Sequence, residues 1–308
     1  MATYARRSAP LAREHGALVV SLIAVATLAW FLTQRRMAGM DAGPGTDLGA
    51  FGFYIGSWVL MMAAMMFPSI VPMVLVYRLA QSRRSELRAA AALGSTPLFV
   101  AGYVISWAAF GTLAYALFVA VRAASIGAFS WHHGGPYVAG AVLLAAALYQ
   151  LTPAKDACLR RCRGPLQFVT HAWRDGPVGA LRMGVEHGAW CVGCCWALMA
   201  GLFALGVMSV GWMVLVAALV AAEKLLPWKR AANLTVAGVT AALAIAVALT
   251  PASVPGLTIP GSPAAERAMS VMGHAHTHMH ARPGQPMRPM PTRMHTKQAM
   301  PGMGSGAR

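Results

Sequence analysis

Residues 185–206 read VEHGAWCVGCCWALMAGLFALG, and no side chain from Gly188 to the end of this stretch carries a charge. As a helix, an apolar run of about 18 residues or more is long enough to cross about 30 Å of hydrocarbon. Similar runs recur along the chain, of which 57% is hydrophobic and 11% charged. Soluble domains carry a charge on about a quarter of their residues. We therefore expect an all-α protein, a polytopic transmembrane helix bundle.

The apolar runs predict about seven membrane spans, at residues 17–33, 51–77, 97–121, 136–152, 185–206, 208–226 and 231–250. They are too long, and too rich in Ala and Leu, for the alternating strands of about ten residues in a membrane β-barrel. No small-residue cleavage site follows the first apolar stretch, so we interpret it as a retained span and not as a signal peptide. Residues 1–250 are thus predicted to form the bundle and residues 251–308 a separate tail.

The positions of Lys and Arg predict the orientation of the bundle. With the N-terminus inside, the inner segments hold sixteen of these residues and the outer loops hold three. Positive residues gather on the cytoplasmic side of membrane proteins. We expect a bacterial inner-membrane protein with a cytoplasmic N-terminus, and an odd number of spans then puts the tail in the periplasm. Because these loops account for most of the net charge of +16, no nucleic-acid partner is predicted.

One face of the helix predicted at residues 185–206 presents an imidazole and several sulfur atoms. Residues three or four positions apart share a helix face. The residues with this spacing are His187, Cys191, Cys194, Cys195 and Met199. A structural alternative is that buried cysteines act only as small apolar side chains. Three cysteines with a histidine in register favour a metal site over that alternative.

A second cysteine pair, Cys158 and Cys162, lies just after the fourth predicted span and completes the five cysteines of the chain. The predicted topology puts both clusters at the cytoplasmic end of the bundle. Thiolate, thioether and imidazole ligands together select Cu(I), Zn(II) or iron–sulfur centres over hard cations. A redox role for the cysteines is less favoured, because this topology puts them on the reducing side of the membrane.

The second predicted span carries a cluster of methionines in the stretch SWVLMMAAMMFPSIVPM, residues 57–73. Thioether sulfur is a neutral, soft ligand that suits Cu(I), although methionine is also a flexible filler of helix contacts. Pro68 and Pro72 are expected to bend the helix next to the cluster. The methionines predicted as ligands are Met61, Met62, Met65 and Met66.

Glu223 and Lys224 lie near the cytoplasmic end of the sixth predicted span. An ionisable residue inside a span is a functional candidate. The alternative is that Lys224 extends its ammonium group to the inner lipid headgroups, with Glu223 close to the interface. The sequence leaves both interpretations open.

The tail after Thr250 is rich in Pro, Gly and Ala and lacks aromatic residues, so we expect it to be disordered. It contains the tract GHAHTHMH at residues 273–280. Short His-rich tracts bind metals, and mixed His and Met ligands suit copper in an oxidising space. The tail histidines predicted as ligands are His274, His276, His278 and His280.

Four motifs together resemble a bacterial family of unknown function, described as predicted metal-binding integral membrane proteins. They are the segment MMAAMMFPS, the segment CLRRC with Pro165 after it, the segment GAWCVGCCWALM, and the Glu223–Lys224 pair. The resemblance covers about residues 50–250, so the first span and the His/Met tail lie outside it. It implies a multi-span membrane protein with a metal site and implies no particular reaction.

These features favour an integral membrane protein that handles Cu(I) in uptake, transfer or homeostasis, with zinc as the alternative metal. Expected partners are the bilayer, the metal ion, and a periplasmic copper chaperone or another membrane protein. The sequence holds no nucleotide-binding loop, and no catalytic or cofactor-binding residue is predicted. Two other hypotheses remain: a membrane oxidoreductase or electron-transfer subunit that uses the cysteines or a bound metal, and an assembly partner whose clusters only pack helices.

Overall fold

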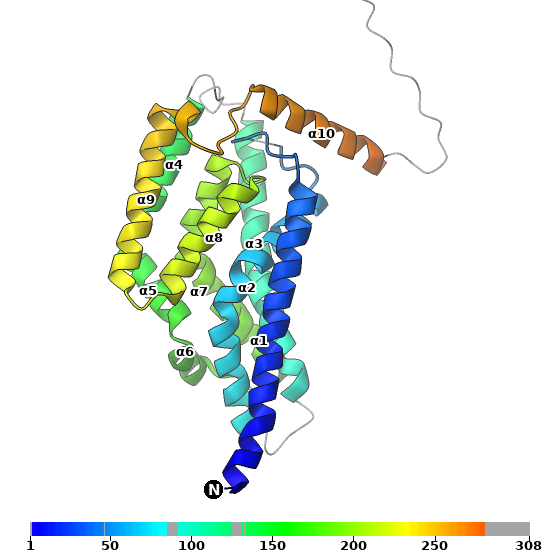
Figure 1. Cartoon of the computed structure of the whole chain (residues 1–308), viewed down its shortest axis with the longest axis vertical. Helices are drawn as coiled ribbons and strands as arrows, with labels where there is room; N and C mark the ends of the chain where they lie inside the picture. Colours follow the sequence, from blue (N-terminus) through cyan, green and yellow to red (C-terminus); the bar gives the residue numbers. More distant parts are fainter. Residues whose placement is uncertain (1, 46, 85–91, 125–130, 132–133, 281–308) are drawn as a thin grey trace, which may run out of the picture.

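The computed structural model describes residues 2–45, 47–84, 92–124, 131 and 134–280. Within these ranges, only the backbone is described for residues 2–14, 82–84, 92–94 and 272–280. All regular structure within these ranges is helical, and none of it is a strand, which confirms the all-α prediction. The long helices lie side by side as a bundle (Figure 1). They are α1 (Ala2–Met37), α2 (Phe51–Arg84), α3 (Ala92–Ala123), α4 (Gly135–Tyr149), α7 (Gly176–Leu205), α8 (Val210–Leu225) and α9 (Lys229–Leu249).

Short elements close the two ends of the bundle. At the lower end in Figure 1, α5 (Pro153–Arg163) and α6 (Pro165–Ala172) connect α4 to α7. At the upper end, the 3-10 helix η4 (Pro251–Ser253) and α10 (Pro263–His280) follow α9. The N-terminal end of α1 lies at the lower end, opposite α10 (Figure 1).

Within the described residues, five helices are long and apolar enough to cross a membrane, or six if α4 and α5 together form one bent span, so the predicted number of seven was slightly too high. The five occupy His15–Met37, Phe51–Gln81, Ser95–Ala123, Gly176–Leu205 and Lys229–Leu249. The predicted fourth span, 136–152, corresponds to α4, which has 15 residues and is followed by α5 at an angle of 66°. The predicted sixth span is α8, which has 16 residues. At 1.5 Å per residue such a helix is about 24 Å long, shorter than about 30 Å of hydrocarbon.

The outer surface of the bundle is apolar, as expected for helices in contact with lipid. Leucines on α3 and α9 leave more than half of their surface exposed, namely Leu113, Leu117 and Leu249. A soluble protein would cover such side chains or replace them with polar ones, because large exposed apolar patches are rare on soluble monomers. The described residues therefore form a membrane protein.

The tail begins with a helix, although its composition predicted disorder. Helix α10 covers Pro263–His280, and the rest of the tail lies outside the described residues. Ala265 and Ala268 of α10 pack on Ala42 in the segment between α1 and α2. The carboxylate of Asp41 in that segment accepts a hydrogen bond of 3.2 Å from Thr258, just before α10. These contacts attach the start of the tail to the bundle.

Helices α3 and α7 cross closely because glycines line their contact. A Cβ at Gly102 of α3 would lie 2.8 Å from the backbone nitrogen of Val185. On α7, a Cβ at Gly184 would lie 2.8 Å from the carbonyl carbon of Phe99, and one at Gly188 would lie 2.7 Å from Ser106. Small residues let membrane helices approach to backbone contact. This crossing brings α3 against the cysteine-bearing part of α7.

A larger residue at this crossing is expected to destabilise the bundle. Replacing Gly184 by Leu forces α3 away from α7, and overpacking of this kind costs about 1–3 kcal/mol. The midpoint of unfolding in mixed detergent and SDS measures the loss. Gly238→Leu on α9 is the matched control, since a Cβ at Gly238 meets no atom within 4 Å. Equal midpoints for the two variants would contradict the close crossing.

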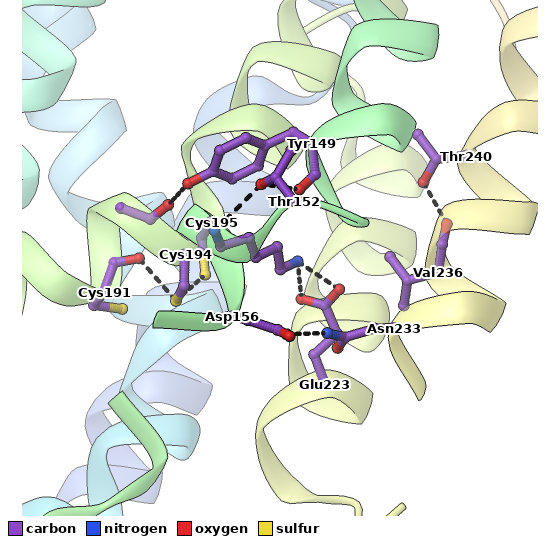
Figure 2. Close-up of polar contacts among 12 residues, drawn as sticks. Tyr149, Thr152, Asp156, Cys191, Cys194, Cys195, Glu223, Asn233, Val236 and Thr240 are labelled. Carbon is purple, nitrogen blue, oxygen red and sulfur yellow. Dashed lines mark hydrogen bonds and ion pairs between the residues drawn. The ribbon is translucent and has the colours of Figure 1, made fainter. Parts of the chain in front are cut away.

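Polar contacts fix α5 against α8 and α9, and a further contact joins the end of α4 to α7 (Figure 2). The ammonium group of Lys155 donates to both carboxylate oxygens of Glu223 on α8, at 2.6 and 2.7 Å, and both side chains are fully buried. Asn233 of α9 donates to Asp156 at 3.2 Å. The hydroxyl of Tyr149, at the end of α4, donates to the carbonyl of Gly193 on α7 at 2.6 Å. The short helix α5 is thereby held in one position.

Candidate metal centre

The sulfur atoms of three cysteines converge inside the bundle. The Sγ atoms of Cys162 on α5 and of Cys191 and Cys194 on α7 all lie within 4.8 Å of one another, and we call these residues the thiol trio. Cys191 and Cys194 are buried, whereas Cys162 is half-buried. A metal–sulfur bond is about 2.3 Å long, so three sulfurs around one ion lie about 4 Å apart in a trigonal plane. The trio fits a metal ion bound in this way.

Two features of the sequence produce the trio. Cys191 and Cys194 are three residues apart on α7, so both side chains lie on the same face of that helix. Pro153 begins α5, and the side chain of Thr152 caps that helix by accepting from the backbone nitrogen of Lys155 at 3.3 Å. Helix α5 therefore starts directly after α4 and turns its Cys162 toward α7.

The other two cysteines lie next to the trio and outside it. The Sγ of Cys195 is 3.3 Å from that of Cys194 and is buried (Figure 2). Cys158 lies on α5 against Gly193, where a Cβ would come within 2.9 Å of its sulfur. The structure thus gathers all five cysteines at the contact of α5 and α7, but only three of them surround a common point.

Lys224 lies against the trio, on the inner side of α8. Its Nζ is 2.9 Å from the Sγ of Cys191 and 3.3 Å from the hydroxyl of Ser69 on α2. The hydroxyl of Tyr103 on α3 forms a further hydrogen bond with Cys191, at 3.0 Å. A buried anionic sulfur needs such a positive charge and such hydrogen bonds to offset its desolvation. Lys224 therefore serves the thiol cluster, and the alternative of an outward-directed lysine does not hold.

One predicted methionine reaches this cluster. The Sδ of Met66 accepts from Nζ of Lys224 at 3.8 Å, which places a thioether beside the trio. The remaining predicted methionines are buried in the core of the bundle, namely Met61, Met62, Met65 and Met199. Their burial fits either of the two roles considered for them, filler or ligand.

His187 lies one helical turn from Cys191 but is not part of the trio. Its ring packs among the rings of Phe99, Tyr103 and Phe168, and it is 2% exposed. Among the described residues, its Nδ1 has no hydrogen-bond partner. His187 therefore borders the site with one unsatisfied nitrogen, and its role as a ligand stays a prediction.

The predicted tail ligands lie far from the trio. His274, His276, His278 and His280 belong to α10, at the upper end of the bundle, and their side chains are outside the described part of the structure. Helix α5, which carries Cys162, lies at the lower ends of α4, α8 and α9 (Figure 1). The two groups of predicted ligands are therefore well separated along the bundle.

Tyr103 and Ser69 were not predicted from the sequence as neighbours of the cysteines. Tyr103 lies on the predicted span 97–121 and Ser69 follows Pro68, but nothing in their spacing relates either of them to α7. The glycines at Gly102 and Gly188 were the available signal, since small residues mark close helix crossings. That signal identifies a crossing and does not identify its partner.

A family model described as a copper chaperone, PpoB2, matches residues 55–247, more than half of the chain. The chain belongs to this family. The match runs from α2 to α9 and includes every cysteine, while α1 and α10 both lie outside it. It covers nearly the segment in which the motifs resemble a metal-binding membrane family, and the family that matches is associated with copper. No curated protein and no solved structure matches the chain.

Lys224→Met is expected to weaken Cu(I) binding by about 10–100-fold, the effect typical of losing a residue that supports metal ligands. The variant keeps the three sulfurs and removes the charge beside Cys191. Competition with a colorimetric Cu(I) chelator, on protein purified without oxygen, measures the affinity. Lys229→Met is the control, because Lys229 is exposed at the start of α9. Equal affinities for the Lys224 variant and the wild type would show that Lys224 does not support the site.

Proposed function

We propose that this protein is a copper chaperone of the bacterial inner membrane, which holds Cu(I) at the thiol trio and passes it to a partner protein. The observation that carries the proposal is the convergence of Cys162, Cys191 and Cys194 within 4.8 Å. Membership of a copper chaperone family supports it. Thiolate ligands select Cu(I) and Zn(II) over hard cations, so the ligand set agrees with the family.

Two observations favour copper over zinc as the cargo. Structural zinc sites are almost always four-coordinate. Among the described residues, no ligand atom of a His, Asp or Glu lies within 4.8 Å of all three sulfur atoms. In addition, one ammonium group, that of Lys224, lies against the trio. Two thiolates, one neutral thiol and one monovalent ion carry a net charge of −1, which a single lysine balances.

In the proposed orientation the N-terminus is cytoplasmic and the tail is periplasmic. The tail histidines at 274, 276, 278 and 280 would then collect copper outside. The buried methionines of α2 would guide the ion along the bundle to the trio. The separation of α10 from α5 along the bundle (Figure 1) is compatible with such a path, and Met66 beside Lys224 is compatible with its inner end.

A complementation experiment tests the function. A bacterial strain that lacks the gene receives either the wild-type protein or the Cys162→Ser/Cys191→Ser variant. We measure total cellular copper and the copper occupancy of the strain's own copper enzymes. A chaperone leaves total copper unchanged. It restores the copper occupancy of the enzymes only in the strain that receives the wild-type protein. Equal occupancy in all strains would contradict the proposal, and a parallel change in total copper would indicate transport instead.

A further inference from the structure

A pocket of about 320 Å³ opens where α5, α6 and α7 meet. Arg161 of α5 and Arg174, just before α7, line it together with Gln167 and His171 of α6. Its volume suits a small molecule and is too small for a protein domain, because small-molecule sites measure about 300–1,000 Å³.

The lining of the pocket is cationic. The guanidinium group of Arg161 lies over the ring of Trp190, 3.9 Å from its centre, so the stacking fixes its position. Glu186 is the acidic residue in the lining, and its carboxylate lies 4.0 Å from the guanidinium group of Arg174. The side chain of Arg174 is 52% exposed and that of Glu186 is 41% exposed. Exposed pairs of this kind are weak. Both arginines are therefore available to an anion.

Two residues that line the pocket are sequence neighbours of two members of the trio. Arg161 precedes Cys162, and Trp190 precedes Cys191. Cys162 is the half-buried member of the trio, while Cys191 and Cys194 are almost completely buried. Cys162 is therefore the member of the trio that is most accessible from outside the bundle.

We propose that this pocket binds a small anionic thiol complex of Cu(I), whose carboxylates contact Arg161 and Arg174 while its copper is exchanged with Cys162. This inference rests on the proposed copper function. In the exchange, a Cu–S bond to the carrier breaks as a bond to Sγ of Cys162 forms. Copper remains Cu(I), and the proton of the Cys162 thiol passes to the thiolate that leaves. No oxidant or reductant is required.

Two copper donors of opposite charge test the inference. The purified full-length protein in neutral detergent is mixed, without oxygen, with Cu(I) as its anionic glutathione complex or as its cationic acetonitrile complex. The rate of loading is followed by the ultraviolet absorption of the copper–thiolate bonds. The test variant is Arg161→Gln/Arg174→Gln. The matched control is Arg160→Gln/Arg182→Gln, which removes two exposed charges from α5 and α7 outside the pocket lining.

The test variant is expected to load about tenfold more slowly from the glutathione complex, because cationic clefts raise the association rates of anions by about tenfold or more. Its rate with the acetonitrile complex, and both rates of the control, should stay near those of the wild type. Equal slowing in the control would overturn the inference in favour of a general surface potential. Slowing that appears only when anionic lipid vesicles are added would overturn it in favour of a lipid headgroup site. If neither donor loads the wild-type protein, the copper function itself fails.

Discussion

The Cys191→Ser/Cys194→Ser variant, purified without oxygen from copper-supplemented cells, is expected to retain less than about one-tenth of the copper bound by the wild-type protein, because hydroxyl groups are poor ligands for Cu(I). Only Cys162 then remains of the three sulfurs that lie within 4.8 Å of one another. Copper per protein, measured by atomic emission, gives the result directly.

Cys195→Ser is the matched control for this loss. Cys195 is as buried as its neighbours and lies next to Cys194 on the same helix, but it is outside the trio. We expect this control to retain most of the copper. Full retention in the double variant would refute the assignment of the site. A wild-type protein that binds no copper would favour the assembly-partner hypothesis, in which the cysteines only pack helices.

Glu223→Gln is expected to destabilise the folded protein by about 3–5 kcal/mol, the cost of removing one partner from a buried ion pair. The substitution leaves the ammonium group of Lys155, which is fully buried, without its counter-charge. Unfolding in mixed detergent and SDS measures the change. Replacing both partners, as Lys155→Met/Glu223→Leu, should cost much less, because no uncompensated charge then remains.

Glu186→Gln provides the comparison with an exposed pair. Its contact with Arg174 is 4.0 Å long and both side chains are exposed, so its loss should cost less than about 1 kcal/mol. A Glu223 variant as stable as the Glu186 variant would mean that the buried pair does not hold α5 in place.

The apolar runs predicted the long helices well, because their length is imposed by the thickness of the membrane. The predicted spans 51–77 and 97–121 fall within the helical segments Phe51–Gln81 and Ser95–Ala123. The sharp bend between α4 and α5 was not predictable in the same way. Pro153 indicates that a helix begins there, but the direction of α5 depends on the pairing of Lys155 with Glu223, 68 residues away.

The spacing of residues along the chain predicted the part of the cysteine site that lies on one helix. Helical spacing relates residues on one helix, and it correctly placed Cys191 and Cys194 on one face. Spacing gives no information on contacts between separate helices. The positions of Cys162 on α5 and Lys224 on α8 beside these cysteines are therefore known only from the structure. His187 shares the spacing of the cysteines, yet the aromatic rings of Phe99 and Phe168 enclose it.

X-ray absorption spectroscopy at the copper edge tests the central claim most directly. On the wild-type protein loaded with one equivalent of Cu(I), the trio predicts an ion surrounded by three sulfur atoms at about 2.3 Å, the length of a metal–thiolate bond. The spectrum of the Cys162→Ser variant should show fewer sulfur neighbours. A first shell dominated by nitrogen or oxygen in the wild-type protein would contradict the claim that Cys162, Cys191 and Cys194 bind the copper.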